Sequence, residues 1–163
     1  MTANSKSTIV QPGQGSTYLA LGDFHTFLAV GEDTGGAYSL TDVVLQPQSM
    51  TPPHFQEQND EAHYILEGEV EYQLDKQTIV AVPGTFLHLP KGQSHGYKNI
   101  GSKPAKILML LTPAGGEQFF AEVGQPVKRP INEEEIRSLS HPPSPEEIEK
   151  AIEVATTKYV RLP

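Results

Sequence analysis

Short runs of apolar or alternating residues cover the chain from about residue 17 to residue 112. Turn-forming residues separate these runs, for example in GEDTGG, PQSMTPP and NIGSKP. The alternation is regular in EVEYQL, where Val70, Tyr72 and Leu74 share one face and the residues between them are polar. Many short strands at this spacing predict a sandwich or a barrel. The predicted strands lie within STYLALG, FHTFLAVG, AYSLTDVVLQ, AHYILEGEVEYQL, TIVAVPG, FLHLP and KILMLLT.

The pattern becomes helical in the last third of the chain. GGEQFFAEVG predicts a short helix that ends at Gly124, and Asn132 is a typical N-cap for the segment INEEEIRSL. The strongest helix signal is SPEEIEKAIEVATTKY, in which Ser144 and Glu147 form a capping box with a Pro at the first helical position. The apolar stripe of this helix comprises Ile148, Ala151, Ile152 and Ala155.

The order of these elements predicts one all-β domain followed by helices. We expect a flexible N-terminal tail at residues 1–16, a β-barrel at residues 17–113, and a helical extension at residues 114–163 that packs on the barrel. The 163 residues, of which 37% are hydrophobic, provide enough apolar side chains for one sizeable core.

Composition and charge exclude several kinds of partner. The formal net charge is −8 and the 12 basic residues are scattered, so neither nucleic acid nor an anionic membrane is an expected partner. The chain has no Cys, which excludes disulfides and thiolate metal sites. No signal-peptide or transmembrane run is visible, and we therefore expect a cytoplasmic protein.

The stretch HFQEQNDE places candidate metal ligands close together. His54 and Gln56 are two residues apart on a predicted strand, so their side chains project from the same face. The polar residues that follow predict a turn, after which Glu61 opens a second strand and can face His54. A buried Glu61 needs a partner that offsets its charge, and a divalent cation is such a partner.

A third ligand is expected about thirty residues further on. Gly84 begins another predicted strand, the segment Pro90 to Gly92 turns the chain, and His95 begins the next strand. The turn returns the imidazole of His95 toward the first two ligands.

These two segments resemble the two motifs of small single-domain cupins. The second motif, G-x5-P-x-G-x2-H-x3-N, is matched at every fixed position, by Gly84, Pro90, Gly92, His95 and Asn99. The first motif, G-x5-H-x-H-x3or4-E-x6-G, is matched by His54, Glu61 and Gly68, whereas Gln48 replaces its first Gly and Gln56 its second His. The wider stretch resembles bacterial cupins that are described as quercetin 2,3-dioxygenase-like.

The resemblance implies an all-β fold, a cupin barrel of the double-stranded β-helix or jelly-roll type, with short C-terminal α-helices. It also implies one divalent transition metal (Fe, Mn, Ni, Co or Zn) held by His54, Gln56, Glu61 and His95. Three of these positions form a 2-His-1-carboxylate set, which suffices for a metal with open coordination positions. Gln56 offers an amide oxygen, which binds late first-row metals more weakly than imidazole does.

Three further residues are candidates for the pocket around the metal. His63 shares the face of Glu61, and we expect it to support the ligands from behind rather than to replace the missing imidazole. Phe86 and Tyr97 are candidate apolar walls, although core packing explains both equally well. His88 has the default interpretation of a core or surface His, and Asp60 that of a turn residue.

The sequence is compatible with two classes of function. The first is a metal-dependent, dioxygenase-like enzyme that acts on a small oxygen-rich or enolisable molecule, with Glu61 as ligand and catalytic base. The second is a non-catalytic small-molecule-binding or sensor protein with weak or no metal, and isomerase or lyase chemistry also uses this scaffold. We expect a homodimer, with Tyr64, Leu66 and the C-terminal helices as candidate contacts.

Overall fold

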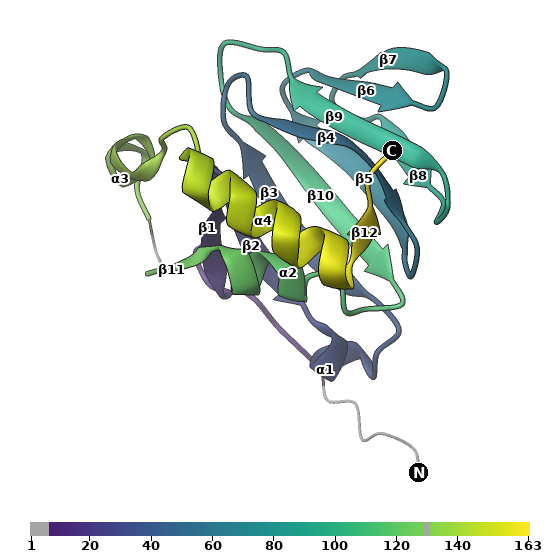
Figure 1. Ribbon diagram of the computed structural model, residues 1–163. Helices are drawn as coiled ribbons and strands as arrows, with labels where there is room; N and C mark the ends of the chain where they lie inside the picture. Colours follow the sequence, from purple (N-terminus) through teal and green to yellow (C-terminus); the bar gives the residue numbers. More distant parts are fainter. Residues whose placement is uncertain (1–6, 129–130) are drawn as a thin grey trace.

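The structure is a computed structural model that describes residues 7–128 and 131–163 (Figure 1). Two antiparallel sheets form the body of the protein. The larger sheet contains β1 (Thr17–Ala20), β2 (Asp23–Ala29), β3 (Ser39–Leu45), β5 (Asp60–Glu67), β8 (Phe86–Leu89), β10 (Ala105–Thr112) and β11 (Gln125–Val127). The smaller sheet contains β4 (Met50–Gln56), β6 (Val70–Leu74), β7 (Gln77–Ala81), β9 (Ser94–Asn99) and β12 (Val160–Arg161).

Strands that are distant in sequence are neighbours in both sheets. The larger sheet has the order β11-β1-β2-β3-β10-β5-β8, and the smaller one has the order β12-β4-β9-β6-β7. The all-β fold expected from the sequence is therefore confirmed. The core between the sheets is formed by inward-facing side chains of both, including Val43, Leu45, Ile65, Val70, Tyr72, Leu89, Ile107 and Met109.

Within the described residues, four helices accompany the sheets. They are α1 (Gly31–Thr34), α2 (Gln118–Val123), α3 (Glu133–Leu139) and α4 (Pro145–Lys158). The predicted capping box of α4 is confirmed, because Ser144 Oγ accepts a hydrogen bond from Glu147 N and Glu147 Oε2 accepts one from Ser144 N. α4 lies beside α2 on the same side of the barrel (Figure 1).

The structure differs from the sequence expectation in the last third of the chain. The expected helical extension also supplies two short strands, since β11 pairs with β1 and β12 pairs with β4. Strands of two or three residues leave no alternation to detect, and only their pairing with distant segments defines them. The predicted boundary at residue 113 directly follows β10, and residues 1–6 of the expected N-terminal tail lie outside the described residues.

Candidate metal centre

β4 brings His54 to the centre of the barrel through an irregular segment. Pro52 and Pro53 lie where the pairing of β4 with β9 shifts register, between Thr51 and His54. Such a bulge inserts one extra residue and reorients the side chain that follows it. His54 then lies directly opposite His95 of β9, and the centroids of the two imidazole rings are 4.5 Å apart.

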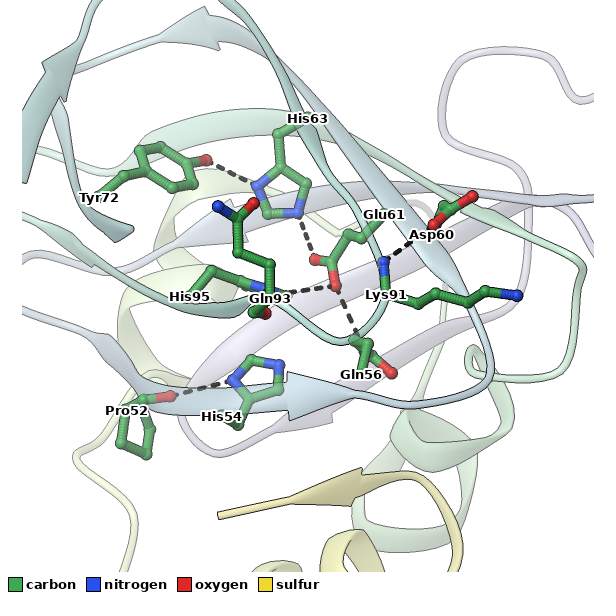
Figure 2. Close-up of polar contacts among 10 residues, drawn as sticks. All are labelled: Pro52, His54, Gln56, Asp60, Glu61, His63, Tyr72, Lys91, Gln93 and His95. Atoms are coloured by element: carbon green, nitrogen blue, oxygen red, sulfur yellow. Dashed lines mark hydrogen bonds and ion pairs between the residues drawn. The ribbon is translucent and has the colours of Figure 1, made fainter. Parts of the chain in front are cut away.

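β5 supplies the carboxylate from the facing sheet. Glu61 is buried, with 3% of its surface exposed, and its Oε2 lies 3.4 Å from His95 Nε2. One potential ligand atom from each of His54, Glu61 and His95 can be chosen so that all three lie within 4.8 Å of one another. Figure 2 shows these side chains converging from three different strands, as the sequence predicts.

Hydrogen bonds orient both imidazoles. The Nδ1 of His54 lies 3.0 Å from the carbonyl oxygen of Pro52, and the Nδ1 of His95 lies 3.4 Å from that of Gln93 (Figure 2). A carbonyl oxygen can only accept, so each Nδ1 carries the proton and donates. This tautomer leaves both Nε2 atoms with a free lone pair, as a metal ligand requires.

The donor set fits a divalent transition metal. Gln56 Oε1 is buried and makes no hydrogen bond within the described residues, and the buried His95 Nε2 has only the Glu61 carboxylate, at 3.4 Å, beside it. A buried polar atom without a partner is costly, and imidazole nitrogens that converge on a buried carboxylate are the arrangement that a cation site needs. Two imidazoles and one carboxylate suit Fe, Mn, Co, Ni or Zn.

His63 holds the carboxylate of Glu61 in place. The Nε2 of His63 donates to Glu61 Oε1 over 2.6 Å, and its Nδ1 shares a hydrogen bond of 2.6 Å with the hydroxyl of Tyr72. Glu61 Oε1 is therefore used by His63, while Oε2 faces His95 and Gln56. His63 lies behind the ligands and does not take the place of Gln56.

The electrostatics favour the protonation states that metal binding requires at Glu61 and His54, whereas at His95 a metal would have to displace a proton. Burial alone would raise the pKa of Glu61, but the charge and the hydrogen bond of His63, together with the nearby His95, hold that pKa well below its usual range. Burial and the charge of His95 lower the pKa of His54. Burial also acts to lower the pKa of His95, but the contact with Glu61 outweighs it and raises that pKa.

Gln56 lies at the position where the motif has its second His. It is buried, with 9% of its surface exposed, and its Nε2 lies 3.3 Å from Glu61 Oε2 as a donor. In this orientation the amide nitrogen faces the site, and a half-turn of the amide would present the oxygen instead. Gln56 therefore belongs to the centre, and its role as a ligand stays a prediction.

The remaining predicted pocket residues fall on different sides of the barrel. Tyr97 is buried and lines the central cavity. Phe86 is 64% exposed, so its prediction as a pocket wall is wrong. The reason is the alternation of β8, in which Leu87 and Leu89 face inward while Phe86 and His88 face outward.

One contact of the site is less visible in the sequence. Tyr72 is the partner of His63, but its place in the alternating strand indicates only a core residue. The pairing of its hydroxyl with His63 depends on two strands meeting in space. Asp60 is the first residue of β5 and not the turn residue expected, and its Oδ1 accepts a hydrogen bond from Lys91 N.

A cavity of about 790 Å³ adjoins the metal centre. At one end it is lined by His54, Gln56, Glu61 and Tyr97. Its other walls come from β1, β2 and β10, from α2 and, unexpectedly, from the C-terminal segment that begins at Ser140. The volume is typical of a site for a small organic molecule.

The fold and this site agree with the comparison to protein families. Residues 41–111 match the family model described as the cupin domain, and this stretch contains all four candidate ligands. This stretch of the chain therefore resembles a cupin domain. No helix within the described residues is long and apolar enough to cross a membrane.

Curated relatives and a solved structure resemble parts of the chain. Quercetin 2,3-dioxygenase from Bacillus subtilis (strain 168) is 29% identical over 118 residues, which are 72% of this chain and 35% of the relative. Polyketide synthase CurC from Streptomyces cyaneus is 28% identical over 105 residues, or 63% of this chain and 66% of the relative. The chain thus spans about a third of the length of one of these relatives and about two thirds of the other.

Among solved structures, KdgF from Halomonas sp. superposes with a TM-score of 0.61 at 17% identity. The superposition covers 69% of this chain and 98% of that protein. At this identity the likeness concerns the fold alone.

Proposed function

We propose that the protein is a metal-dependent, dioxygenase-like enzyme that acts on a small oxygen-rich or enolisable molecule. The observation that carries the proposal is the convergence of His54, Glu61 and His95, all buried, with one potential ligand atom from each within 4.8 Å of the others. The likeness to a quercetin 2,3-dioxygenase supports the choice of reaction. A bound divalent metal would supply Lewis acidity and a template for the substrate and O₂.

The residues of the chain have separate tasks in this proposal. The two imidazoles and Glu61 would hold the metal, and Tyr97 would border the substrate. Glu61 Oε2, the oxygen that His63 does not use, would accept the proton of a substrate hydroxyl. The His63 and Tyr72 side chains keep the carboxylate in this orientation.

Metal content and oxygen uptake test the proposal. Protein purified without chelator, or reconstituted separately with Fe, Mn, Ni, Co and Zn, is expected to hold close to one metal per chain by elemental analysis. Glu61→Gln is expected to lower this content strongly, because the amide removes the anionic ligand. Glu67→Gln, an exposed position on the same strand, is the matched control. Oxygen consumption with quercetin and simpler enols then tests the reaction.

One observation favours a second candidate function. Gln56 replaces an imidazole, which weakens the affinity for late first-row metals. A small-molecule-binding or sensor protein with little metal would accordingly show sub-stoichiometric metal with all five ions. That result would contradict the enzyme proposal, provided that a cooperative thermal denaturation curve shows that the protein is folded.

A further inference from the structure

The apolar stripe of α4 forms one wall of the cavity beside the metal centre. Cavity-lining residues of this helix include all four members of the stripe, Ile148, Ala151, Ile152 and Ala155. The wall continues beyond the helix with Tyr159, Val160 and Leu162. The segment with no role in the metal centre therefore faces whatever binds there.

α4 is fixed to the barrel near its C-terminal end. β12, which follows the helix, pairs with β4 so that Val160 lies opposite Gln56. Lys158 Nζ and the Tyr159 hydroxyl both bind the carboxylate of Glu122, over 2.6 and 2.5 Å. Arg161 lies over the ring of Phe55, 4.0 Å from its centroid. The position of the wall is thus tied to the strand that carries His54.

Despite this attachment, the stripe is only partly buried. Ala151 packs closely, with 4% of its surface exposed, whereas Ile148 is 42% and Ile152 is 48% exposed. An amphipathic helix that docks on a core normally buries such residues. Here the two isoleucines border open space, and that space is continuous with the metal centre.

The cavity is polar at one end and apolar over much of the rest. The polar end holds the candidate metal ligands and the apolar part faces α4, α2 and the inner ends of several strands. Apolar residues that line this part include Leu45, Met50, Met109, Leu111, Phe119 and Phe120. A ligand that fills both parts must itself have a polar and an apolar end.

We propose that α4 is a wall of the ligand site and that the ligand is an elongated amphiphile. Its oxygen-bearing, metal-chelating head binds at His54, Glu61 and His95, and its apolar body lies against Ile148 and Ile152. The proposed binding of the head rests on the function proposed above, whereas the proposed binding of the apolar body rests only on the shape and lining of the cavity. A small molecule is favoured over a second copy of the chain because the apolar face continues into the metal centre.

A chelator series of graded length tests the two parts separately. Protein loaded with Zn, which has no redox chemistry, is titrated calorimetrically with acetohydroxamate and with longer n-alkyl hydroxamates up to octanohydroxamate. The affinity is expected to rise about threefold to fourfold for each added methylene, as for burial of a CH₂ group. Acetohydroxamate reports on the metal, and the increase with length reports on the apolar wall.

A substitution in α4 tests whether this helix causes the increase of affinity with the length of the alkyl chain. Ile152→Gln replaces the apolar side chain with a polar one that favours a helix at least as well, and it is expected to weaken octanohydroxamate binding at least tenfold while acetohydroxamate is unaffected. Because Ile152 is already half exposed, the variant is expected to fold. Glu153→Gln, the adjacent exposed position outside the cavity lining, is the matched control and is expected to change neither affinity.

The outcomes distinguish a failure of this inference from a failure of the proposed metal-dependent function. If acetohydroxamate fails to bind the Zn-loaded protein, the metal proposal fails, and 1-octanol binding to the metal-free protein, weakened by Ile152→Gln, still supports the wall. Equal affinity for all chain lengths, or no effect of Ile152→Gln on octanohydroxamate, overturns the inference. Dimer dissociation caused by Ile152→Gln, without an effect on the probes, would assign the face to a second copy and also overturn it.

Discussion

Gln56 distinguishes this metal centre from one with three imidazoles. Its neutral amide faces Glu61, the anionic ligand, from a distance of 3.3 Å. An amide oxygen is a weaker ligand than imidazole for Fe, Co, Ni or Zn and is relatively better suited to harder ions. In the function proposed here, this one side chain would therefore affect how tightly, and with what preference, the centre holds a metal.

Gln56→His is expected to raise the affinity for Zn or Ni by at least about tenfold, because even groups behind metal ligands have effects of that size. Competition with a chromophoric chelator measures this change. Gln73→His, which adds an imidazole at an exposed position of β6, is the control. Equal affinity of Gln56→His and wild type would show that the side chain at position 56 points away from the metal.

Asp23 gives the protein a pH dependence that is separate from metal binding. Burial raises the pKa of Asp23 to about 6, against the hydrogen bonds from the Ser49 hydroxyl and Gln46 N. The folded state thus holds this proton more tightly than the unfolded chain does. The stability contributed by Asp23 is present below about pH 4 and is lost between about pH 4 and 6, by about 3 kcal/mol.

Buried His25 has the opposite slope, because burial lowers its pKa to about 3 and stability is lost as the pH falls. The comparison must therefore be made between variants. The unfolding free energy of Asp23→Asn minus that of wild type is expected to increase by about 3 kcal/mol from pH 4 to pH 7. Urea denaturation across this range measures the difference, and a constant difference would contradict the assigned pKa.

At the level of elements, the metal centre depends on the irregular pairing of β4 with β9. Gly96 of β9 lies against the bulge, and a Cβ at this position would come within 2.8 Å of Pro53 N and 2.9 Å of Thr51 O. These are backbone atoms that cannot rotate away. The absent side chain therefore allows β4 to approach β9 closely enough for His54 to face His95.

Gly96→Ala is expected to push the two strands apart, at a cost of about 1–3 kcal/mol in stability, as for an overpacked core. It is also expected to weaken metal binding, because His54 and His95 separate. Thermal denaturation and a metal titration measure the two effects. Ser94→Ala, on the same strand, removes one oxygen without adding bulk and is the control. Unchanged metal affinity in Gly96→Ala would show that the strand spacing does not position the ligands.

The elements differ in how far the sequence predicts them. The barrel strands and the helix at Ser144 follow from alternation and capping, which are local signals. The first half of β4 is hard to predict from the sequence because Pro52 and Pro53 are typical turn residues. In the structure they lie at the bulge, where a missing N–H is tolerated. β12 is defined by its pairing with β4, a partner about a hundred residues away.

The same division applies to the candidate site. His54, Glu61 and His95 could be placed from strand parity and motif spacing, because both are properties of the local sequence. The inward position of Tyr97 was only one of two explanations, and the outward position of Phe86 depends on the phase of a four-residue strand. The contribution of α4 to the cavity could not be predicted, since nothing local relates a surface helix to the mouth of a barrel.

At the scale of the whole molecule, the outer surface of the larger sheet carries a pair of exposed aromatic residues. Tyr64 is 43% and Phe86 is 64% exposed, and the two lie opposite each other on β5 and β8. β8 is the edge strand of that sheet. The homodimer expected from the sequence would bury this surface.

If so, Phe86→Lys is expected to weaken the dimer by about 2 kcal/mol, the usual effect of an aromatic anchor at an interface. Analytical ultracentrifugation over a micromolar range measures the dissociation constant. Val80→Lys changes a similarly exposed apolar residue on the other sheet and is expected to have no effect. A wild-type protein that sediments as a monomer at these concentrations would contradict the expected assembly.

The pairing of β12 with β4 relies on main-chain groups, whose geometry is the same for most amino acids. The C-terminal segment can therefore change cavity-lining side chains such as Ile148 and Ile152 during evolution while this pairing, together with Lys158 and Arg161, keeps it attached. A chimera that carries the last twenty residues of a homologue would in that case bind the same metal ion but select a different organic ligand. Chemistry and selectivity would then be inherited separately within a single small domain.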